Sequence, residues 1–117
     1  MRVNKSIQLP RAIGDGKDRE VQVLLADRWR KLVLIQLRRE ALLADHSARV
    51  PITIQGVAGK GILRVGSDTY ELVPGAIVAV DAHVLHNVQG DPEAAILVSF
   101  FRQDDARDEN DTTAQFD

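Results

Sequence analysis

The chain has 117 residues, of which 44% are hydrophobic and 27% are charged, and its formal net charge at pH 7 is −2. This length suits a single domain with one hydrophobic core, and no run approaches the roughly 18 consecutive apolar residues of a membrane-spanning helix. The sequence contains no cysteine, which excludes disulfides and thiolate chemistry, and its first residues lack the apolar run of a signal peptide. We therefore expect a cytoplasmic protein without a membrane partner.

Charge is unevenly distributed along the chain. Residues 103–117 carry six acids against one base, Arg107, so the residues before them carry a net charge of about +3. A segment this acidic buries too little apolar surface to offset its ordering entropy, which predicts a mobile acidic tail. The basic residues around one apolar segment are too scattered for a nucleic-acid-binding surface, and we expect them to form a solvated rim: Arg28, Arg30, Lys31, Arg38 and Arg39.

The first third of the chain contains two predicted strands. Residues 1–19 show little periodicity and are predicted to form an N-terminal arm on the surface. Residues 20–26 begin with the alternation of a strand, and residues 31–37 are apolar at both parities, which predicts a strand buried on both faces. Residues 38–44 have the composition of a helix, but we interpret them as a loop that descends towards His46.

The rest of the chain predicts short strands separated by turns. Turn signals stand at Gly59-Lys60-Gly61, Gly66-Ser67, Pro74-Gly75 and Gly90-Asp91-Pro92. The segments between these and neighbouring glycines have strand composition: residues 51–57, 62–65, 69–72, 76–80, 84–88 and 94–101. About eight short strands and no convincing helix indicate an all-β, antiparallel sandwich or barrel over residues 20–102.

Two segments carry a family resemblance. Residues 42–59 and 72–86 resemble the two motifs of a small single-domain cupin of the RmlC-like type. The spacings match: His46 lies seven residues before Thr53 and thirteen before Gly59, and Gly75 lies eleven before His86. The resemblance implies a double-stranded β-helix, also called a jelly-roll barrel, with a ligand or metal site inside.

The resemblance also implies a divalent metal such as Zn, Fe, Ni, Mn or Cu, held by a His-x-His pair, a glutamate and a further histidine. His46 and His86 match two of these ligands, whereas Ala48 and Thr53 stand where the second histidine and the glutamate belong. His83 is the remaining candidate for a third ligand, although residues i and i+3 of an extended strand point to opposite faces. Further departures from the motifs are Glu40 and His83 in place of glycines, Asp81 in place of a proline, and Gly90 in place of an asparagine.

Strand parity extends the predicted site. If Thr53 faces the barrel interior, Gln55 also faces it, and Ile52 and Ile54 face outward. The neutral donors and acceptors of His46, Thr53, Gln55 and His86 would then suit a small polar or carboxylate ligand. In the alternative structural interpretation, the two histidines are polar barrel residues bonded to each other, to Thr53 or to water.

The same parity predicts a homodimer. Ile52 and Ile54, with one face of residues 32–35, would leave an apolar strand surface in water unless a second copy covered it. Burial of each such side chain contributes about 1.5 to 3 kcal/mol, so a few from each protomer could support a stable dimer.

Two functional classes follow from these residues. The first is a cupin that binds or senses a small molecule without catalysis, because the metal-ligand set is incomplete and no inward carboxylate is evident. The alternative is a metal-dependent dioxygenase or isomerase in which His46 and His86 hold the metal, with His83 as the candidate third ligand. A metal-free epimerase with histidine as its base is a third class, although Tyr70 has no evident tie to the site as a paired acid.

Overall fold

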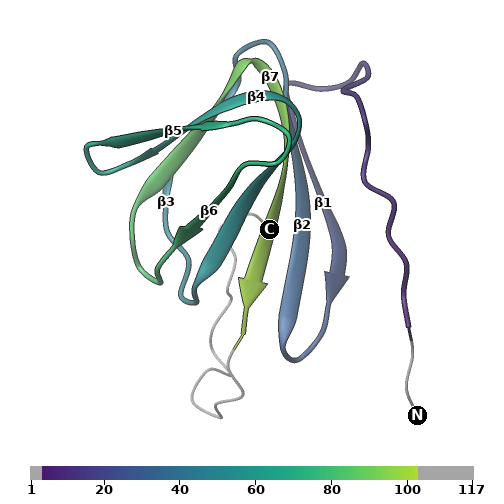
Figure 1. Ribbon diagram of the computed structural model, residues 1–117, viewed down its shortest axis with the longest axis vertical. Coiled ribbons are helices and arrows are strands. Elements are labelled where there is room, and N and C mark those ends of the chain that lie inside the picture. The colour runs from purple at the N-terminus through teal and green to yellow at the C-terminus, as the bar shows by residue number, and fades with distance from the viewer. Residues whose placement is uncertain (1–3, 103–117) are drawn as a thin grey trace.

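The computed structural model describes residues 4–102, which form seven β-strands and no helix (Figure 1). The strands are β1 (Arg19–Ala26), β2 (Arg30–Leu37), β3 (Leu42–His46), β4 (Ile52–Val65), β5 (Asp68–Leu72), β6 (Ile77–Val80) and β7 (His86–Phe101). All named strand pairs are antiparallel, which confirms the predicted all-β class. In this part of the chain no helix is long and apolar enough to cross a membrane. The predicted acidic segment 103–117 lies outside the described residues.

The two longest strands, β4 and β7, pair with each other and join two layers of sheet. The first half of β4 and the second half of β7 lie in a larger layer whose strand order is β1-β2-β7-β4-β6. The other halves of β4 and β7 lie in a smaller layer with β3 and β5. Figure 1 shows these layers curving around a common interior. Closure of this kind leaves few unpaired strand edges.

Alternation along the strands builds the core. Inward residues of the larger layer include Val33, Ile35 and Phe100, and those of the smaller layer include Leu63 and Val88, all of which are at most 1% exposed. Because cross-strand partners share a face, the interior between the layers is filled mainly by Val, Ile, Leu and Phe side chains.

Three predicted boundaries were wrong. Residues 42–44 of the expected loop 38–44 belong to β3, because this strand pairs with β7. The signals at residues 59–61 and 90–92 do not end strands; they lie within β4 and β7, where the pairing register shifts. Gly59 adopts a φ of 67°, and a Cβ atom there would lie 2.3 Å from the carbonyl oxygen of Glu93, so only glycine fits this bend.

The N-terminal arm is held against the barrel by Arg38. Its guanidinium donates hydrogen bonds to the carbonyl oxygens of Gly14 (2.7 Å) and Lys17 (2.8 Å), to the Gln36 side chain, and to the carboxylate of Glu20. Arg38 is only 4% exposed, so its predicted place in a solvated rim was wrong. The same correction applies to Lys31, which is also 4% exposed.

Candidate functional site

Two of the predicted site residues, His46 and His86, lie together. His46 ends β3, His86 begins β7, and the two are direct partners in the strand register. Their ring centroids are 4.2 Å apart and the ring planes meet at 64°, an edge-to-face contact. His86 has the same parity as the core residue Val88 and is 2% exposed, so the pair faces the barrel interior.

Backbone hydrogen bonds fix the orientation of both imidazoles. The Nδ1 atom of His46 lies 2.6 Å from the carbonyl oxygen of Ala44, and the Nδ1 atom of His86 lies 3.0 Å from that of Val84. A carbonyl oxygen only accepts, so each Nδ1 carries the proton of the neutral ring and each Nε2 carries a lone pair. The Nε2 atom of His86 is buried and has no hydrogen-bond partner among residues 4–102.

Burial keeps these rings neutral. Loss of solvation lowers the pKa of both His46 and His86 below the ordinary histidine value of 6.5, although the backbone hydrogen bond of each ring acts in the opposite direction. The proximity of His86 lowers the pKa of His46 further, while the Asp45 carboxylate raises it. At neutral pH the pair therefore presents hydrogen-bond acceptors rather than positive charge.

The structure places Thr53 and Gln55 away from this pair. Ile52 and Ile54 are 2% and 0% exposed and belong to the core cluster, so the alternation of β4 turns Thr53 and Gln55 to the outer face of the larger layer. The predicted parity was wrong, and Thr53 and Gln55 do not line the interior with the histidines. Taken alone, the alternation of Ile52-Thr53-Ile54-Gln55 predicts that the isoleucines face the core and that Thr53 and Gln55 face outward, as the structure shows.

Lys31 is an interior polar residue that the sequence interpretation missed. It pairs with Phe100 in the strand register, and its Nζ atom lies 5.7 Å from the centroid of the Phe100 ring, within the range of a cation–π contact. Its parity with Val33 and Ile35 is the signal that could have revealed its inward position.

Lys31 and the histidine pair lie at the same end of the barrel, where β2 and β7 begin and β3 ends (Figure 1). Backbone hydrogen bonds tie the loops of this end together, from His83 N to Ala48 O (2.7 Å) and from Phe101 N to Pro51 O (3.1 Å). The interior of this end therefore combines two neutral acceptor rings and one cation among apolar side chains.

Solved structures with the same architecture identify the fold. An RmlC-like cupin protein from Desulfovibrio desulfuricans superposes with a TM-score of 0.72 at 20% identity over 83% of this chain and 95% of that chain. A cupin superfamily protein from Desulfitobacterium hafniense gives 0.71 at 13% identity over 78% and 84%. The chain has the cupin fold. This finding confirms the predicted jelly-roll barrel.

The cupin fold alone does not assign an activity. A DMSP lyase from Ruegeria pomeroyi also superposes, with a TM-score of 0.67 at 14% identity over 72% of this chain and 47% of that chain. No protein-family model matches this sequence, and no curated protein matches it either. Function must therefore be argued from the residues of this chain.

The residues present do not fit the metal centre that the cupin resemblance implies. His83, the predicted third ligand, is exposed in the turn before β7, and Ala48 is a buried core residue at the position of the second motif histidine. Residues 4–102 contain no group of three or more His, Asp or Glu side chains placed to hold a metal ion. A stable mononuclear centre usually takes three or four protein ligands, and within the described part of the chain two candidate ligands, His46 and His86, come together.

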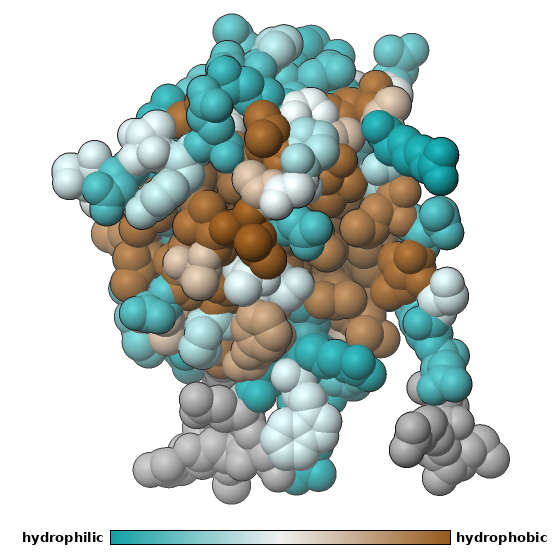
Figure 2. Space-filling view, in the orientation of Figure 1, coloured by the Kyte–Doolittle hydropathy of each residue, from teal (hydrophilic) through white to brown (hydrophobic). Residues whose placement is uncertain are grey.

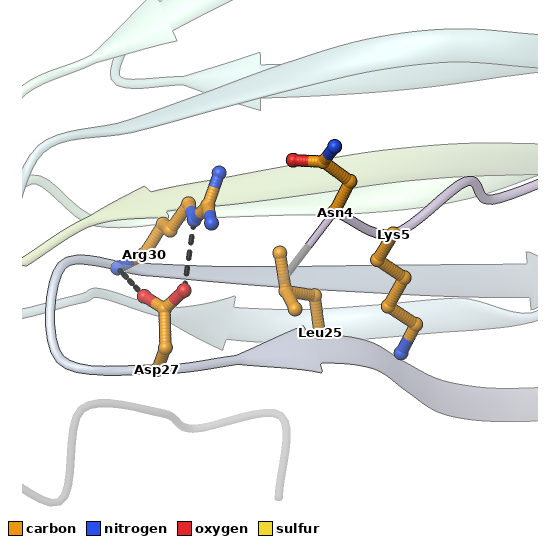
Figure 3. A pocket seen from close by; sticks show the side chains of 5 residues that line it. All are labelled: Asn4, Lys5, Leu25, Asp27 and Arg30. Carbon is orange, nitrogen blue, oxygen red and sulfur yellow. Dashed lines mark hydrogen bonds and ion pairs between the residues drawn. The ribbon is translucent and has the colours of Figure 1, made fainter. Parts of the chain in front are cut away.

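A separate hollow lies outside the barrel, between the arm and the β1–β2 turn (Figure 3). Its volume is about 410 Å³, and it is lined by Asn4, Lys5, Leu25, Asp27 and Arg30. The Asp27 carboxylate accepts a 2.9 Å hydrogen bond from Arg30 Nε and two more from backbone N–H groups, and these bonds lower the pKa of Asp27. This carboxylate is thus engaged in shaping the turn, and the histidine pair remains the better candidate for function.

Proposed function

We propose that this cupin binds a small hydroxyl-bearing or amine-bearing molecule at the His46–His86 end of its barrel, as a cytoplasmic binding or sensing protein rather than a metal-dependent enzyme. The observation that carries the proposal is the Nε2 atom of His86, which is buried and lacks a hydrogen-bond partner among the described residues. A buried acceptor that makes no hydrogen bond costs about 1 to 3 kcal/mol. A ligand that donates to this atom would recover that cost.

The chemistry of this end of the barrel narrows the class of ligand. A neutral imidazole whose Nδ1 is already donating can only accept at Nε2, so the ligand must offer an O–H or N–H group. Lys31 adds a positive charge on the inner face of the opposite layer, which favours a ligand that also carries an acid. A small hydroxy acid meets both conditions. The apolar surroundings and the closed loops limit its size.

The alternative is a metal-dependent dioxygenase or isomerase. It would use the same two histidines, but it needs at least one more ligand than residues 4–102 bring to the site. No contact within the described residues favours it over ligand binding. It therefore enters the experiment as a competing outcome.

The test is a titration of the protein, labelled with ¹⁵N at its histidines, with a panel of small hydroxy acids and the matched acids that lack the hydroxyl. We expect a hydroxy acid to shift the Nε2 resonance of His86 strongly and the resonances of exposed His83 little. His86→Phe removes the acceptor and should weaken binding about tenfold, the value of one good hydrogen bond. His83→Phe is the matched control and should leave affinity unchanged.

Two results would contradict the proposal. No shift of His86 with any hydroxyl-bearing or amine-bearing ligand at millimolar concentration would remove the binding function. Near-stoichiometric metal in untagged protein purified without chelator, lost in His46→Ala, would favour the metal-dependent alternative.

A further inference from the structure

The hollow between the N-terminal arm and the β1–β2 turn combines positive charge with apolar surface. Among its five lining residues, Lys5 and Arg30 carry two positive charges against the single negative charge of Asp27, so the lining has a net charge of +1. Asn4 adds a side-chain amide. Figure 3 shows Leu25 between Arg30 and Lys5. A lining of this kind suits an anion that also has an apolar part.

The guanidinium of Arg30 is held in place by Asp27. Arg30 Nε donates a 2.9 Å hydrogen bond to Asp27 Oδ2, while Asp27 Oδ1 accepts 3.0 Å bonds from the backbone N–H groups of Trp29 and Arg30. Within residues 4–102, neither Nη group of Arg30 has a hydrogen-bond partner. The two Nη groups form the end of a planar fork that can donate to both oxygens of one carboxylate. The turn therefore presents a donor pair that is already oriented, which lowers the entropic cost of binding.

The opposite wall of the hollow is the arm, which is attached to the barrel at several places. Lys5 Nζ donates a 2.7 Å hydrogen bond to the carbonyl oxygen of Leu24. Further along the arm, Ile13 packs against an apolar cluster outside the barrel, and Arg38 binds two arm carbonyls. Figure 2 shows mainly polar side chains along the arm at the lower right of the view, whereas apolar side chains gather over the middle. An ammonium has three N–H groups, so Lys5 can donate to a ligand while it stays attached.

Size and charge narrow the class of ligand. The volume of about 410 Å³ falls within the roughly 300 to 1,000 Å³ of pockets that hold small organic molecules. A carboxylate balances the net charge of the lining, whereas a phosphate group, at about −1.5 to −2, would leave excess negative charge near Asp27. Contact between hydrocarbon and Leu25 is favourable, and an inorganic anion cannot make it. A monocarboxylate with a short apolar chain or ring meets all three conditions.

We propose that this hollow is a second binding site, for a small amphipathic carboxylate. The carboxylate oxygens accept hydrogen bonds from the Nη groups of Arg30 and from Lys5, and the apolar part contacts Leu25. Because one wall belongs to the arm and the other to the β1–β2 turn, the bound molecule ties the arm to the barrel. The site lies outside the barrel, so its occupancy does not depend on ligand binding at the histidine pair.

Titration of the full chain with hexanoate, followed by calorimetry and by ¹⁵N NMR of the arginine Nε groups, tests the proposal. We expect saturable binding that is at least about fivefold tighter than that of acetate, and no binding of uncharged hexanamide. Arg30→Gln should weaken hexanoate binding at least about tenfold, and Arg30→Lys, which keeps the charge without the fork, should restore only part of it. Arg19→Gln is the matched control, because it makes the same charge change on an exposed side chain at the other end of β1. It should leave the affinity unchanged.

Limited proteolysis measures whether the ligand ties down the arm. Arg11 and Lys17 are exposed trypsin sites in the arm. Hexanoate at ten times its Kd should slow cleavage at these sites about tenfold, and it should have no such effect on Arg30→Gln.

A further variant keeps the test decisive. Lys5→Gln alters an exposed side chain, so it should fold even if Arg30→Gln does not, and it should weaken hexanoate binding about threefold to fivefold. The proposal would be overturned by the absence of saturable binding at tens of millimolar hexanoate, or by equal affinity for hexanoate and inorganic phosphate. It would also be overturned if Arg19→Gln weakened binding as much as Arg30→Gln or, should that variant not fold, as much as Lys5→Gln.

Discussion

His83 holds a backbone conformation that costs free energy in any residue other than glycine. Its φ is 68°, in the left-handed region, and it occupies a position where the cupin motif has glycine. The backbone N–H of His83 donates to Ala48 O, and its side chain is exposed. A substitution with glycine therefore keeps the backbone hydrogen bond and removes an exposed imidazole together with the Cβ atom that causes the strain.

The expected gain follows from two opposing terms. A left-handed conformation costs an ordinary residue roughly 1 to 2 kcal/mol, and glycine returns roughly 0.5 to 1 kcal/mol of this through the greater freedom of the unfolded chain. His83→Gly should therefore raise the free energy of unfolding by about 0.5 to 1 kcal/mol. For a domain of this size, the melting temperature should rise by about 2 to 5 °C.

Urea denaturation and thermal melting, both followed by circular dichroism, measure this gain. His83→Ala is the control, because it removes the imidazole but keeps the Cβ, and it should not stabilise the protein. Glu40→Gly is a second case, since Glu40 also has a positive φ of 60° and also replaces a motif glycine. The reasoning fails if His83→Gly is no more stable than His83→Ala, because the strain would then be absent.

Three other substitutions or conditions test the packing. The melting temperature should fall as pH drops from 7 to 5. The folded protein lowers the pKa of His46 and His86, so in this range the unfolded chain, whose histidines have pKa values near 6.5, binds more protons than the folded protein. The variant with both His46→Phe and His86→Phe should lose this pH dependence. Arg38→Ala should lower the free energy of unfolding, measured in urea, by roughly 2 to 3 kcal/mol, because the N-terminal arm loses its hydrogen bonds to the guanidinium. Unchanged stability would show that these hydrogen bonds do not stabilise the fold. Ile54→Ala should cost about 2 to 5 kcal/mol and Thr53→Val less than about 1 kcal/mol, and the reverse order would contradict the observed parity of β4.

The strands of this chain could be predicted more securely than the faces that they bury. Local patterns identified the segments of β1, β2 and the first half of β4: alternation for β1, a run that is apolar at both parities for β2, and strand composition for β4. The inward face of β4 was predicted wrongly because Thr53 was matched to a motif ligand, and that match outweighed the apolar pattern of Ile52 and Ile54. Burial of two isoleucines is worth several kcal/mol, which decides the register against any single polar residue.

The continuity of β4 and β7 could not be read locally. Glycine and proline at residues 59–61 and 90–92 have the composition of turns, and only pairing with a distant strand shows that they are bends within a ladder. The burial of Arg38 is hidden for the same reason, because its partners are arm carbonyls about twenty residues away. Non-local contacts of this kind leave no periodic signal.

A single variant, His86→Phe, can distinguish a structural role of the histidine pair from a ligand-binding role. The comparison needs its free energy of unfolding without ligand and its affinity for the ligand. If a buried polar ring has only a structural role, its hydrogen bonds should stabilise the folded state, and its replacement by an apolar ring of similar size should destabilise the protein. The His86 ring makes one backbone hydrogen bond and leaves its Nε2 atom unpaired among the described residues, so it contributes little to the free protein. We therefore expect His86→Phe to be neutral or stabilising without ligand, while it weakens hydroxy acid binding. A loss of more than about 2 kcal/mol in the free protein would instead make His86 a structural residue, as would unchanged binding.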